Sequence, residues 1–237
     1  MYGFESRVRY SETGKDGKLT LESILNYFQD CTTFHSEEIG CGIDYLAERN
    51  TLWVLLSWQI VVKRYPKMGE KLQILTKPYD FKKSFGYRNF MMYDEKGEFI
   101  AYANSVWLYV DMEKMLPVKV DEYQREAYAL EEKLPMEYKE MKIAIPKEGG
   151  ITGTPFQVQT YHLDTNEHVN NGQYLRMAFQ AVGKEIEVKQ MRAEYKKSAL
   201  LGDVIQPEVY KDEFGYIVAL NDIEGKPYAV IELTVNG

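Results

Sequence analysis

The sequence predicts an α+β protein built from two copies of one unit, each a long helix packed across an antiparallel sheet. Three observations support this fold class. The 237 residues are 45% hydrophobic and 14% aromatic, enough for two cores of about 100 to 130 residues each. Two segments have the apolar spacing of a helix with one buried face. Each is followed by strand-like segments whose turns recur at a nearly constant distance along the chain.

The two predicted helices show the same periodicity. Residues 19–30 place apolar side chains at i, i+3, i+4 and i+7, and residues 173–183 repeat this spacing, which is typical of one buried helix face. We therefore expect long helices near residues 20–40 and 171–187. The apolar positions are Leu21, Ile24, Leu25 and Phe28 in the first helix, and Tyr174, Met177, Ala178, Ala181 and Val182 in the second.

The strand-like segments also repeat. A turn at Gly69 recurs at Gly202, 133 residues later, and a DEKG turn ending at Gly97 recurs as DIEG ending at Gly225, 128 residues later. Glycine supplies the positive φ that such turns need. We infer a tandem duplication. A long helix wrapped by one antiparallel sheet is the hot-dog arrangement, so the predicted fold is a tandem double hot-dog.

The repeat sets the predicted domain boundaries. The first unit and the start of the connection occupy residues 1–135, a linker occupies 136–150, and the second unit occupies 151–237. The connecting segment contains Pro117, Pro135, Pro146 and the pair Gly149-Gly150, which interrupt regular structure. Within it, residues 121–132 are expected to form a short helix.

Composition excludes several classes of protein. A formal net charge of -7 and a pI of about 5.2 argue against nucleic-acid binding. Cys31 and Cys41 are the only cysteines, too few for a disulfide scaffold and consistent with a reducing compartment. The first residues lack the apolar region of a secretion signal, and no apolar stretch is long enough to span a bilayer. These features predict a cytoplasmic protein.

Residues 162–171, HLDTNEHVNN, concentrate polar chemistry just before the second helix. Asp164, Asn166 and His168 are spaced i, i+2, i+4, so in an extended segment their side chains would point the same way. Asn170 is a good N-cap, and Gln173 completes a capping-box-like pattern.

Three interpretations of this segment remain open from the residues alone. A water held by the Asp, Asn or His side chains, with a carbonyl held by the backbone N–H groups at Asn171 and Gly172, would suit hydrolysis of an activated acyl group. A purely structural capping turn is about as compatible with the spacing. A metal site is the weakest option, because one Asp and one His lack clear further ligands.

The run TYHLDTNEHVNNGQYLRMA resembles the signature of the acyl-[acyl-carrier-protein] thioesterases of bacteria and plant plastids, which carry D-x-N-x-H-V-N-N before the helix of their second hot-dog unit. The resemblance covers nearly the whole chain, including the strand end Trp107–Asp111 and EYKKSALLGD at 194–203. It implies hydrolysis of fatty acyl thioesters on acyl carrier protein to free fatty acid, without a cofactor. Asp164, Asn166 and His168 match the catalytic residues of the family.

The resemblance also implies an acyl-chain pocket in the first unit. Its candidate residues double as plain core residues, which is the more common role for such side chains. The acyl carrier protein is the implied partner, and a homodimer is compatible with the sequence. The candidate pocket residues are Ile24, Leu25, Phe28, Trp53, Leu55 and Trp58.

The chain departs from the family pattern at Ser198, where the family has a Glu thought to help activate water. Serine cannot accept a proton at neutral pH, so either Asp164 and His168 suffice, activity is reduced, or the chain binds acyl groups without turnover. Ala199 excludes a cysteine nucleophile at the next position. We expect Ser198→Glu to raise turnover, mainly above neutral pH, because a nearby Asp164 would raise the pKa of the new carboxyl.

An acyl-coenzyme A hydrolase is the nearest alternative enzyme. Carrier protein is acidic, so a basic surface patch would favour it over coenzyme A. Two groups of basic residues are candidates for such a patch: Lys63, Arg64, Lys67 and Lys71 in the first unit, and Lys189, Arg192, Lys196 and Lys197 in the second.

Overall fold

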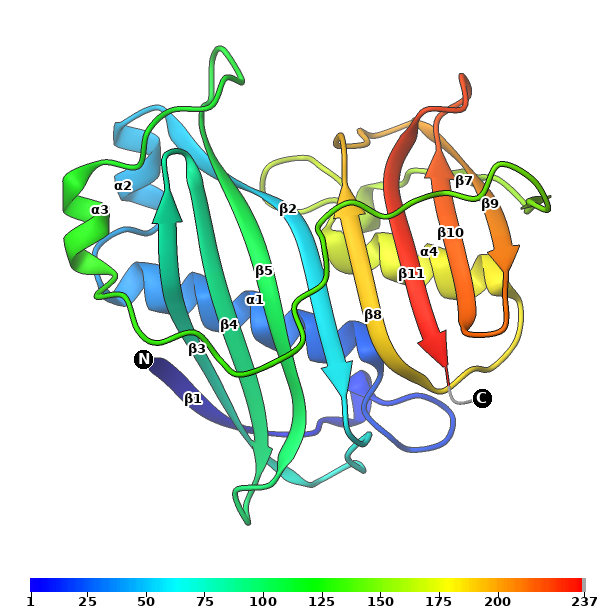
Figure 1. The fold of residues 1–237 in the computed structure, drawn as a ribbon, viewed down its shortest axis with the longest axis horizontal. Coiled ribbons are helices and arrows are strands. Elements are labelled where there is room, and N and C mark those ends of the chain that lie inside the picture. Colours follow the sequence, from blue (N-terminus) through cyan, green and yellow to red (C-terminus); the bar gives the residue numbers. More distant parts are fainter. Residues whose placement is uncertain (236–237) are drawn as a thin grey trace. The chain divides into compact units, whose positions relative to one another are not determined.

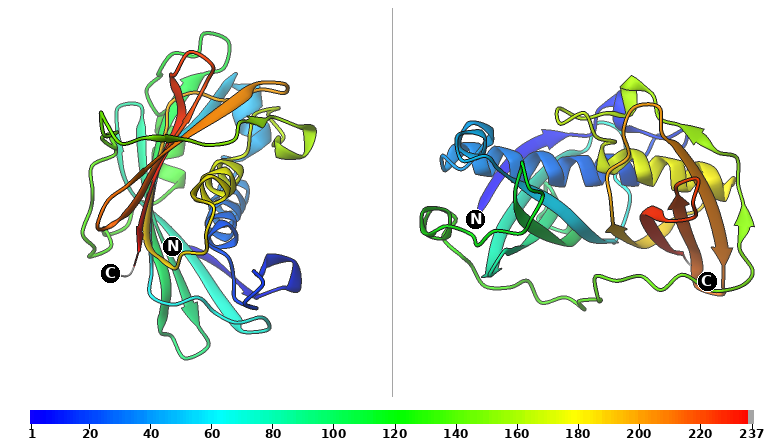
Figure 2. Two further views of the ribbon diagram at one scale, coloured as in Figure 1. Left: turned by 90° about the vertical axis from the view of Figure 1, so that its right-hand side faces the viewer. Right: turned by 90° about the horizontal axis from the view of Figure 1, so that it is seen from above.

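The computed structural model describes residues 1–235, so residues 236 and 237 of the predicted second unit lie outside the described residues. The chain forms two compact units, which divide between Lys139 and Glu140. In each, one long helix lies across one face of an antiparallel sheet (Figures 1 and 2). The predicted fold class is therefore confirmed.

Unit 1 is a five-stranded antiparallel sheet with helix α1 (Leu21–Glu38) packed on it. The strand order is β1 (Tyr2–Arg7), β3 (Lys71–Lys82), β4 (Phe85–Asp94), β5 (Phe99–Asp111) and β2 (Thr51–Val62). A 3-10 turn, η1 (Tyr10–Glu12), precedes α1, and the short helices α2 (Ile43–Glu48) and α3 (Glu122–Ala127) follow α1 and β5.

Helix α1 forms where the sequence predicts it. The Thr20 hydroxyl accepts the N–H of Ser23 at 3.1 Å, which satisfies one of the free amides of the first turn. The predicted apolar positions are all buried: Leu21, Ile24, Leu25 and Phe28. The helix is thus held by its apolar face and by a side-chain cap.

Unit 2 repeats the arrangement with a shorter helix, α4 (Asn171–Val182). The strand order is β8 (Val188–Tyr195), β11 (Pro227–Val235), β10 (Gly215–Asn221), β9 (Val204–Lys211) and β6 (Ile151–Thr152). Strand β7 (Phe156–Gln157) also pairs with β9, and a 3-10 turn, η2 (Thr160–His162), precedes α4. The prediction that this helix reaches residue 187 is wrong, because Gly183 adopts the left-handed conformation, φ 72°, and ends it.

The hairpin turns confirm the internal repeat. Gly69 and Gly202 share φ 87°, and Gly97 and Gly225 have φ 78° and 80°. Each DxxG turn is also fixed by a cation that follows the first long strand of its unit. Arg64 bonds Asp94 at 2.8 Å, and Lys197 bonds Asp222. These ion pairs lower the pKa of both aspartates.

The segment predicted as a linker at 136–150 is hydrogen-bonded in part. In unit 1, the side chain of Gln59 donates to the carbonyl of Glu137 at 2.8 Å and accepts the N–H of Lys139 at 3.0 Å. In unit 2, Glu194 accepts the N–H of Ile143 at 2.9 Å. The helix predicted at 121–132 is shorter, six residues capped by Asp121.

Within residues 1–235, no helix is long and apolar enough to cross a membrane.

Candidate functional site

The segment that carries Asp164, Asn166 and His168 is a closed turn. Leu163 and Val169 form an antiparallel bridge. Inside it the N–H of Asp164 donates to the carbonyl of His168 at 2.8 Å, and Glu167 takes a positive φ of 59°. The segment is therefore not extended, and the shared side-chain direction that an extended segment would give does not follow from its backbone.

The Asp164 carboxylate adds side-chain hydrogen bonds to the closed turn. Its Oδ1 accepts the N–H of Asn166 at 2.8 Å and the N–H of His168 at 3.4 Å, the pattern of an Asx turn. These bonds bring the three predicted residues together through the backbone. Asp164 and His168 are half-buried, whereas Asn166 is exposed.

The start of helix α4 is capped as predicted, with one consequence for the chemistry. Asn170 Oδ1 accepts the N–H of Gly172 at 2.9 Å. The N–H of Asn170 donates to the carbonyl of His162 at 2.9 Å, where the capping-box pattern would use Gln173. Because the cap already occupies the Gly172 amide, this N–H is not available to an oxyanion in this structure.

Ser198 lies beside the turn, in the loop that joins β8 to β9, and its side chain is exposed. The next residue, Ala199, is fully buried. The carbonyl of Ala199 accepts the N–H of Val169 at 3.0 Å, and its own N–H donates to the Tyr174 hydroxyl at 2.9 Å. Strand β8 ends at Tyr195, three residues before Ser198.

Unit 1 contains a second copy of this turn. Thr13 and Leu19 form the equivalent bridge. The N–H of Gly14 donates to the carbonyl of Lys18 at 2.9 Å, and Gly17 has φ 71°. The N–H of Leu19 donates to the carbonyl of Pro66 at 2.8 Å, as Val169 does to Ala199.

The two copies share a backbone but not their side chains. Gly14, Asp16 and Lys18 occupy the positions of Asp164, Asn166 and His168. A turn of this shape therefore forms without the Asp, Asn and His side chains at those positions. The shape of the backbone alone therefore does not determine which side chains occupy these positions.

Two tyrosines, the buried Tyr174 and the half-buried Tyr195, hydrogen-bond to backbone groups of the site, and the sequence analysis assigned neither of them to it. The Tyr174 hydroxyl holds Ala199, and the Tyr195 hydroxyl donates to the carbonyl of Asn171 at 3.3 Å. Burial raises the pKa of both phenols, so they act as neutral hydrogen-bonding groups. Tyr174 was predicted only as part of an apolar helix face.

His162 has a structural role at the entrance to the turn. Its Nδ1 accepts the N–H of Gln159 at 3.0 Å, and burial and the charge of Arg176 lower its pKa. In unit 1 the carboxylate of Glu12 accepts the N–H of Arg9 at 2.9 Å in the same way. This histidine is therefore a cap of η2.

The candidate acyl-pocket residues lie in the interior of unit 1. The rings of Phe28 and Trp58 stack with centroids 6.3 Å apart. Trp53 is partly buried and donates its Nε1–H to Gln124 at 2.9 Å, so it belongs to a separate cluster with Phe81 and Tyr109. The others are buried in the core: Ile24, Leu25, Phe28, Leu55 and Trp58.

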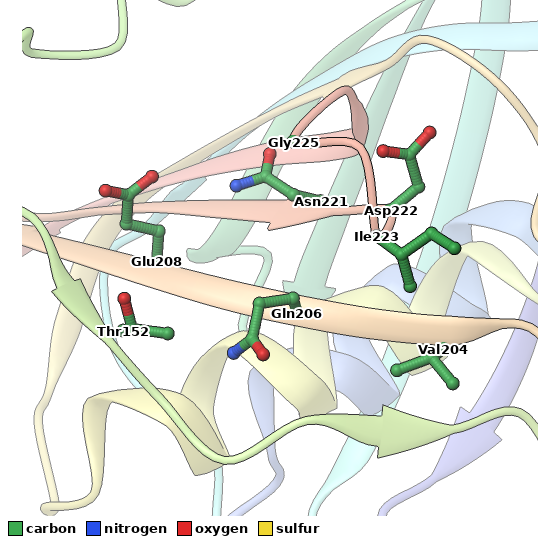
Figure 3. Close-up of a pocket in the computed structure, with 8 residues that line it drawn as sticks. All are labelled: Thr152, Val204, Gln206, Glu208, Asn221, Asp222, Ile223 and Gly225. Carbon is green, nitrogen blue, oxygen red and sulfur yellow. The ribbon is translucent and has the colours of Figure 1, made fainter.

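A hollow of about 400 Å³ lies on unit 2 (Figure 3). Strand β9 contributes Val204, Gln206 and Glu208, which alternate with the buried Ile205 and Pro207. Side chains that alternate along a strand point to opposite faces of the sheet. The hollow is therefore on the face away from the buried residues, and its lining includes none of the three motif residues. The remaining lining residues are Thr152, Asn221, Asp222, Ile223 and Gly225.

Most of the predicted basic patches are neutralised by local carboxylates. Five of the eight cations form ion pairs within their own unit. Charge complementarity alone therefore gives weak support to an acidic protein partner. The pairs are Arg64 with Glu70 and Asp94, Lys71 with Glu95, Arg192 with Glu232, Lys196 with Glu194, and Lys197 with Asp222.

Among residues 1–235, no three His, Cys, Asp or Glu side chains are grouped so that they could hold an ion.

The fold is that of a double hot-dog protein, and the turn before α4 carries Asp164, Asn166 and His168. Residues 1–128 match the acyl-ACP thioesterase N-terminal domain, and residues 147–233 match the acyl-ACP thioesterase C-terminal domain. The chain therefore belongs to the acyl-ACP thioesterase family.

The curated proteins that the chain matches include distant plant relatives. A chloroplastic acyl-[acyl-carrier-protein] hydrolase of Cuphea viscosissima is 25% identical over 91% of this chain and 58% of its own length. A chloroplastic palmitoyl-acyl carrier protein thioesterase of Arabidopsis thaliana is 23% identical over 92% of this chain and 57% of its own. The chain thus spans somewhat more than half the length of these relatives.

Solved structures share the fold along the whole chain. An acyl-ACP thioesterase from Bacteroides thetaiotaomicron superposes with a TM-score of 0.89 at 21% identity, covering 99% of this chain and 97% of that one. The 12:0-ACP thioesterase from Umbellularia californica gives a TM-score of 0.88 at 17% identity, covering 99% and 96%.

Proposed function

We propose that this protein hydrolyses fatty acyl thioesters of acyl carrier protein to free fatty acid. One observation carries the proposal beyond family membership. The turn before α4 bears Asp, Asn and His, whereas the same backbone turn in unit 1 bears Gly, Asp and Lys. Unit 2 therefore has acid–base groups at two positions where the same backbone turn also forms with Gly14 and Lys18.

In the proposed mechanism, Asp164 orients a water molecule and His168 assists as its partner or as the base. Oδ1 of Asp164 is fixed by two backbone N–H groups, which holds the carboxylate in one orientation. Asn166 positions the water or the thioester. Water attacks the acyl carbonyl, the C–S bond breaks, and the carrier leaves as a thiol.

Charge stabilisation in this mechanism comes from the start of α4 as a whole. The Gly172 N–H is already bonded to the Asn170 cap. The helix start therefore contributes through the partial positive charge at the N-terminus of a 12-residue helix. This field stabilises the developing oxyanion at short range.

Hydrolysis of acyl-coenzyme A is the second candidate. The observation that favours it is the local pairing of five predicted patch cations, which removes the main charge argument for an acidic carrier. The third candidate, acyl binding without turnover, rests on Ser198.

The test is an assay of the purified chain against carrier-protein and coenzyme A thioesters of several chain lengths. Asp164→Asn keeps an oxygen that can accept the two backbone N–H groups, so the turn should survive. We expect Asp164→Asn and His168→Ala to lower kcat by about 10² to 10⁴ without loss of fold. Faster turnover on coenzyme A would favour the second candidate.

Two control variants separate chemistry from structure. The triple change Asp164→Gly, Asn166→Asp, His168→Lys copies the unit 1 turn and should fold but be inactive. Asn170→Ala removes only the cap, which costs about 0.5 to 2 kcal/mol, and should retain turnover. Activity that merely follows stability across all four variants would contradict the proposed roles.

A further inference from the structure

Three polar side chains of unit 2 line one hollow of about 400 Å³ (Figure 3). Asn221 on β10 is paired directly with Gln206 on β9, and Glu208 lies two residues further along β9. Directly opposed residues, and residues two apart on one strand, project from the same face of a sheet. Small-molecule sites typically have volumes of about 300–1,000 Å³, so the hollow is large enough to hold a ligand.

Asn221 is almost fully buried, yet its side-chain amide has no hydrogen-bond partner. Its exposed fraction is 8%, and within residues 1–235 no group bonds to this amide. By contrast, the amide of Gln206 donates to the carbonyl of Gly153 at 2.7 Å. Buried polar groups are almost always paired in folded proteins. An unpaired, buried amide that lines a hollow is therefore suited to hold a ligand group.

Glu208 gives the hollow a negative charge that no cation of the described residues 1–235 balances. It forms no ion pair among them, and no Lys or Arg lines the hollow. Its neighbour Tyr210 is a neutral phenol, because burial and the adjacent Glu208 raise the pKa of Tyr210. The other carboxylate of the lining, Asp222, is already paired with Lys197. The hollow is therefore matched to a ligand that brings a positive charge.

Unit 1 fills the position of Asn221 with an aromatic ring. The two DxxG turns align Asn221, just before Asp222, with Tyr93, just before Asp94. The Tyr93 ring packs against Phe99, with the ring centroids 4.5 Å apart. The shorter Asn221 side chain thus leaves space in unit 2 at a position where the other copy of the fold has a packed ring.

The rim of the hollow, Val204 and Ile223, is apolar where unit 1 has an ion pair. Both side chains line the hollow and both are exposed. Their counterparts in unit 1, counted from the same turns, are Lys71 and Glu95, which pair at 3.6 Å. An apolar rim beside a few polar groups is the usual composition of a site for a ligand with an apolar part.

We propose that the hollow binds the ammonium group of a free primary aliphatic amine. The ammonium has three N–H donors, which match the Glu208 carboxylate and the amide oxygen of Asn221. Glu208 is paired with Ala219, two residues before Asn221, so the two acceptors are diagonal neighbours with backbones about 7–8 Å apart. Hydrogen bonds between charged groups are about twice as strong as neutral ones.

The alkyl chain of the amine lies against the rim. Val204 is four residues from Glu208 along β9, a distance of about 13 Å, so a chain of about six carbons is long enough to reach Val204 and Ile223 from the acceptors. The site shares no residue with the turn before α4. The proposal therefore does not depend on hydrolysis at that turn.

The experiment is a titration of the isotope-labelled full chain with hexylamine, followed by the NMR shifts of the backbone amides. Hexanol and hexanoate are the neutral and anionic probes of equal length. We expect hexylamine to bind about tenfold more tightly than either, with shifts concentrated in β9, β10 and the DIEG turn. Glu208→Gln should remove this preference. Glu213→Gln, which removes an exposed carboxylate outside the hollow, should keep it.

Two further variants copy unit 1 into the hollow. Asn221→Tyr should block hexylamine binding, because the ring fills the space. The double variant Val204→Lys/Ile223→Glu replaces the apolar rim with the ion pair of unit 1, and should remove the preference for hexylamine over ethylamine while keeping ethylamine binding. Because it changes only exposed side chains, this variant tests the site even where Asn221→Tyr does not fold, which thermal unfolding shows.

Equal binding of hexylamine and hexanol would overturn the proposal. Equal weakening by Glu208→Gln and Glu213→Gln would also overturn it, by reducing the effect to a general attraction to an acidic protein. Unchanged binding in folded Asn221→Tyr would place the amine elsewhere. N-acetyl-lysine amide carries the same ammonium on a peptide-like group. Tighter binding of this probe than of hexylamine would contradict a free amine and favour a lysine side chain of another protein.

Discussion

At the scale of single residues, the turn before α1 and the turn before α4 have the same backbone hydrogen bonds but different side chains. Gly14 and Asp164 both donate a backbone N–H across the turn, at 2.9 and 2.8 Å. Only Asp164 adds a carboxylate at that position, fixed by the N–H groups of Asn166 and His168. The duplication therefore provides an internal comparison that a single hot-dog unit could not.

Ser198 allows a sharp prediction at the same scale. Its exposed side chain precedes Ala199, whose carbonyl is bonded to Val169. We expect Ser198→Glu to raise turnover without changing acyl-chain preference. Because an exposed carboxyl keeps a pKa near its ordinary value of about 4.3, the gain should already be present at neutral pH, which revises the expectation of a gain mainly above it.

The measurement is a pH–rate profile of Ser198→Glu beside Ser198→Gln, which has the same size without the charge. A gain shared by both variants would point to packing and not to a carboxylate. Lower turnover at every pH would indicate that Asp164 and His168 act without a third group.

At the scale of elements, the contact between the long helix and the loop that follows the first long strand differs between the two units. Unit 2 places Tyr174 where unit 1 has Ile24, and Ala199 where unit 1 has Pro66. Proline has no N–H and needs no acceptor, whereas the buried N–H of Ala199 is satisfied by the Tyr174 hydroxyl. The Tyr174–Ala199 pair and the Ile24–Pro66 pair therefore each leave no buried N–H of the loop residue without an acceptor.

A double-mutant cycle tests this coupling. Tyr174→Phe should destabilise the chain by about 1–3 kcal/mol, because it leaves the Ala199 N–H buried and unpaired. Ala199→Pro alone should also be destabilising, because it leaves the Tyr174 hydroxyl without its donor. The double variant should be more stable than the sum of the two changes predicts, with a coupling of at least about 1 kcal/mol in urea unfolding. Strict additivity would contradict the link.

At the scale of the whole molecule, a buried histidine makes stability depend on pH. His35 packs against Tyr2 and Tyr128 and beside Arg88, and its pKa is lowered to about 3 by burial and by that charge. The unfolded chain, with an ordinary pKa of about 6.5, binds more protons than the folded chain between these values. Stability is therefore expected to fall as pH decreases from about 6.5 towards 3.

His35→Asn removes this titration while keeping an oxygen that can accept from Arg88. Urea unfolding of the intact chain between about pH 4.5 and 7 should show a flatter dependence for His35→Asn than for the parent. Asp94 and Asp222 do not contribute to the difference in slope between the two proteins. Their ion pairs lower their pKa values, so both stay ionised in this range. An equal slope in both proteins would exclude His35 as the cause.

The sequence by itself determined the features that depend on near neighbours. The duplicated layout, both helix starts, the Asn170 cap and the turn glycines were all predicted, because apolar periodicity and turn chemistry act over a few residues. The family resemblance rested on similarly local motifs. The end of α4 was missed at Gly183, although glycine at a helix C-terminus is a recognisable local signal.

Only the tertiary structure decided which groups meet. The closed turn at 164–168 depends on a bridge between Leu163 and Val169 and on the carbonyl of Ala199, 30 residues further along the chain. The contact between Arg88 on β4 and His35 on α1 depends on the register of the sheet and on the packing of the helix against it. Strand register is set by long-range pairing and packing, so no local pattern in the sequence could have placed these side chains together.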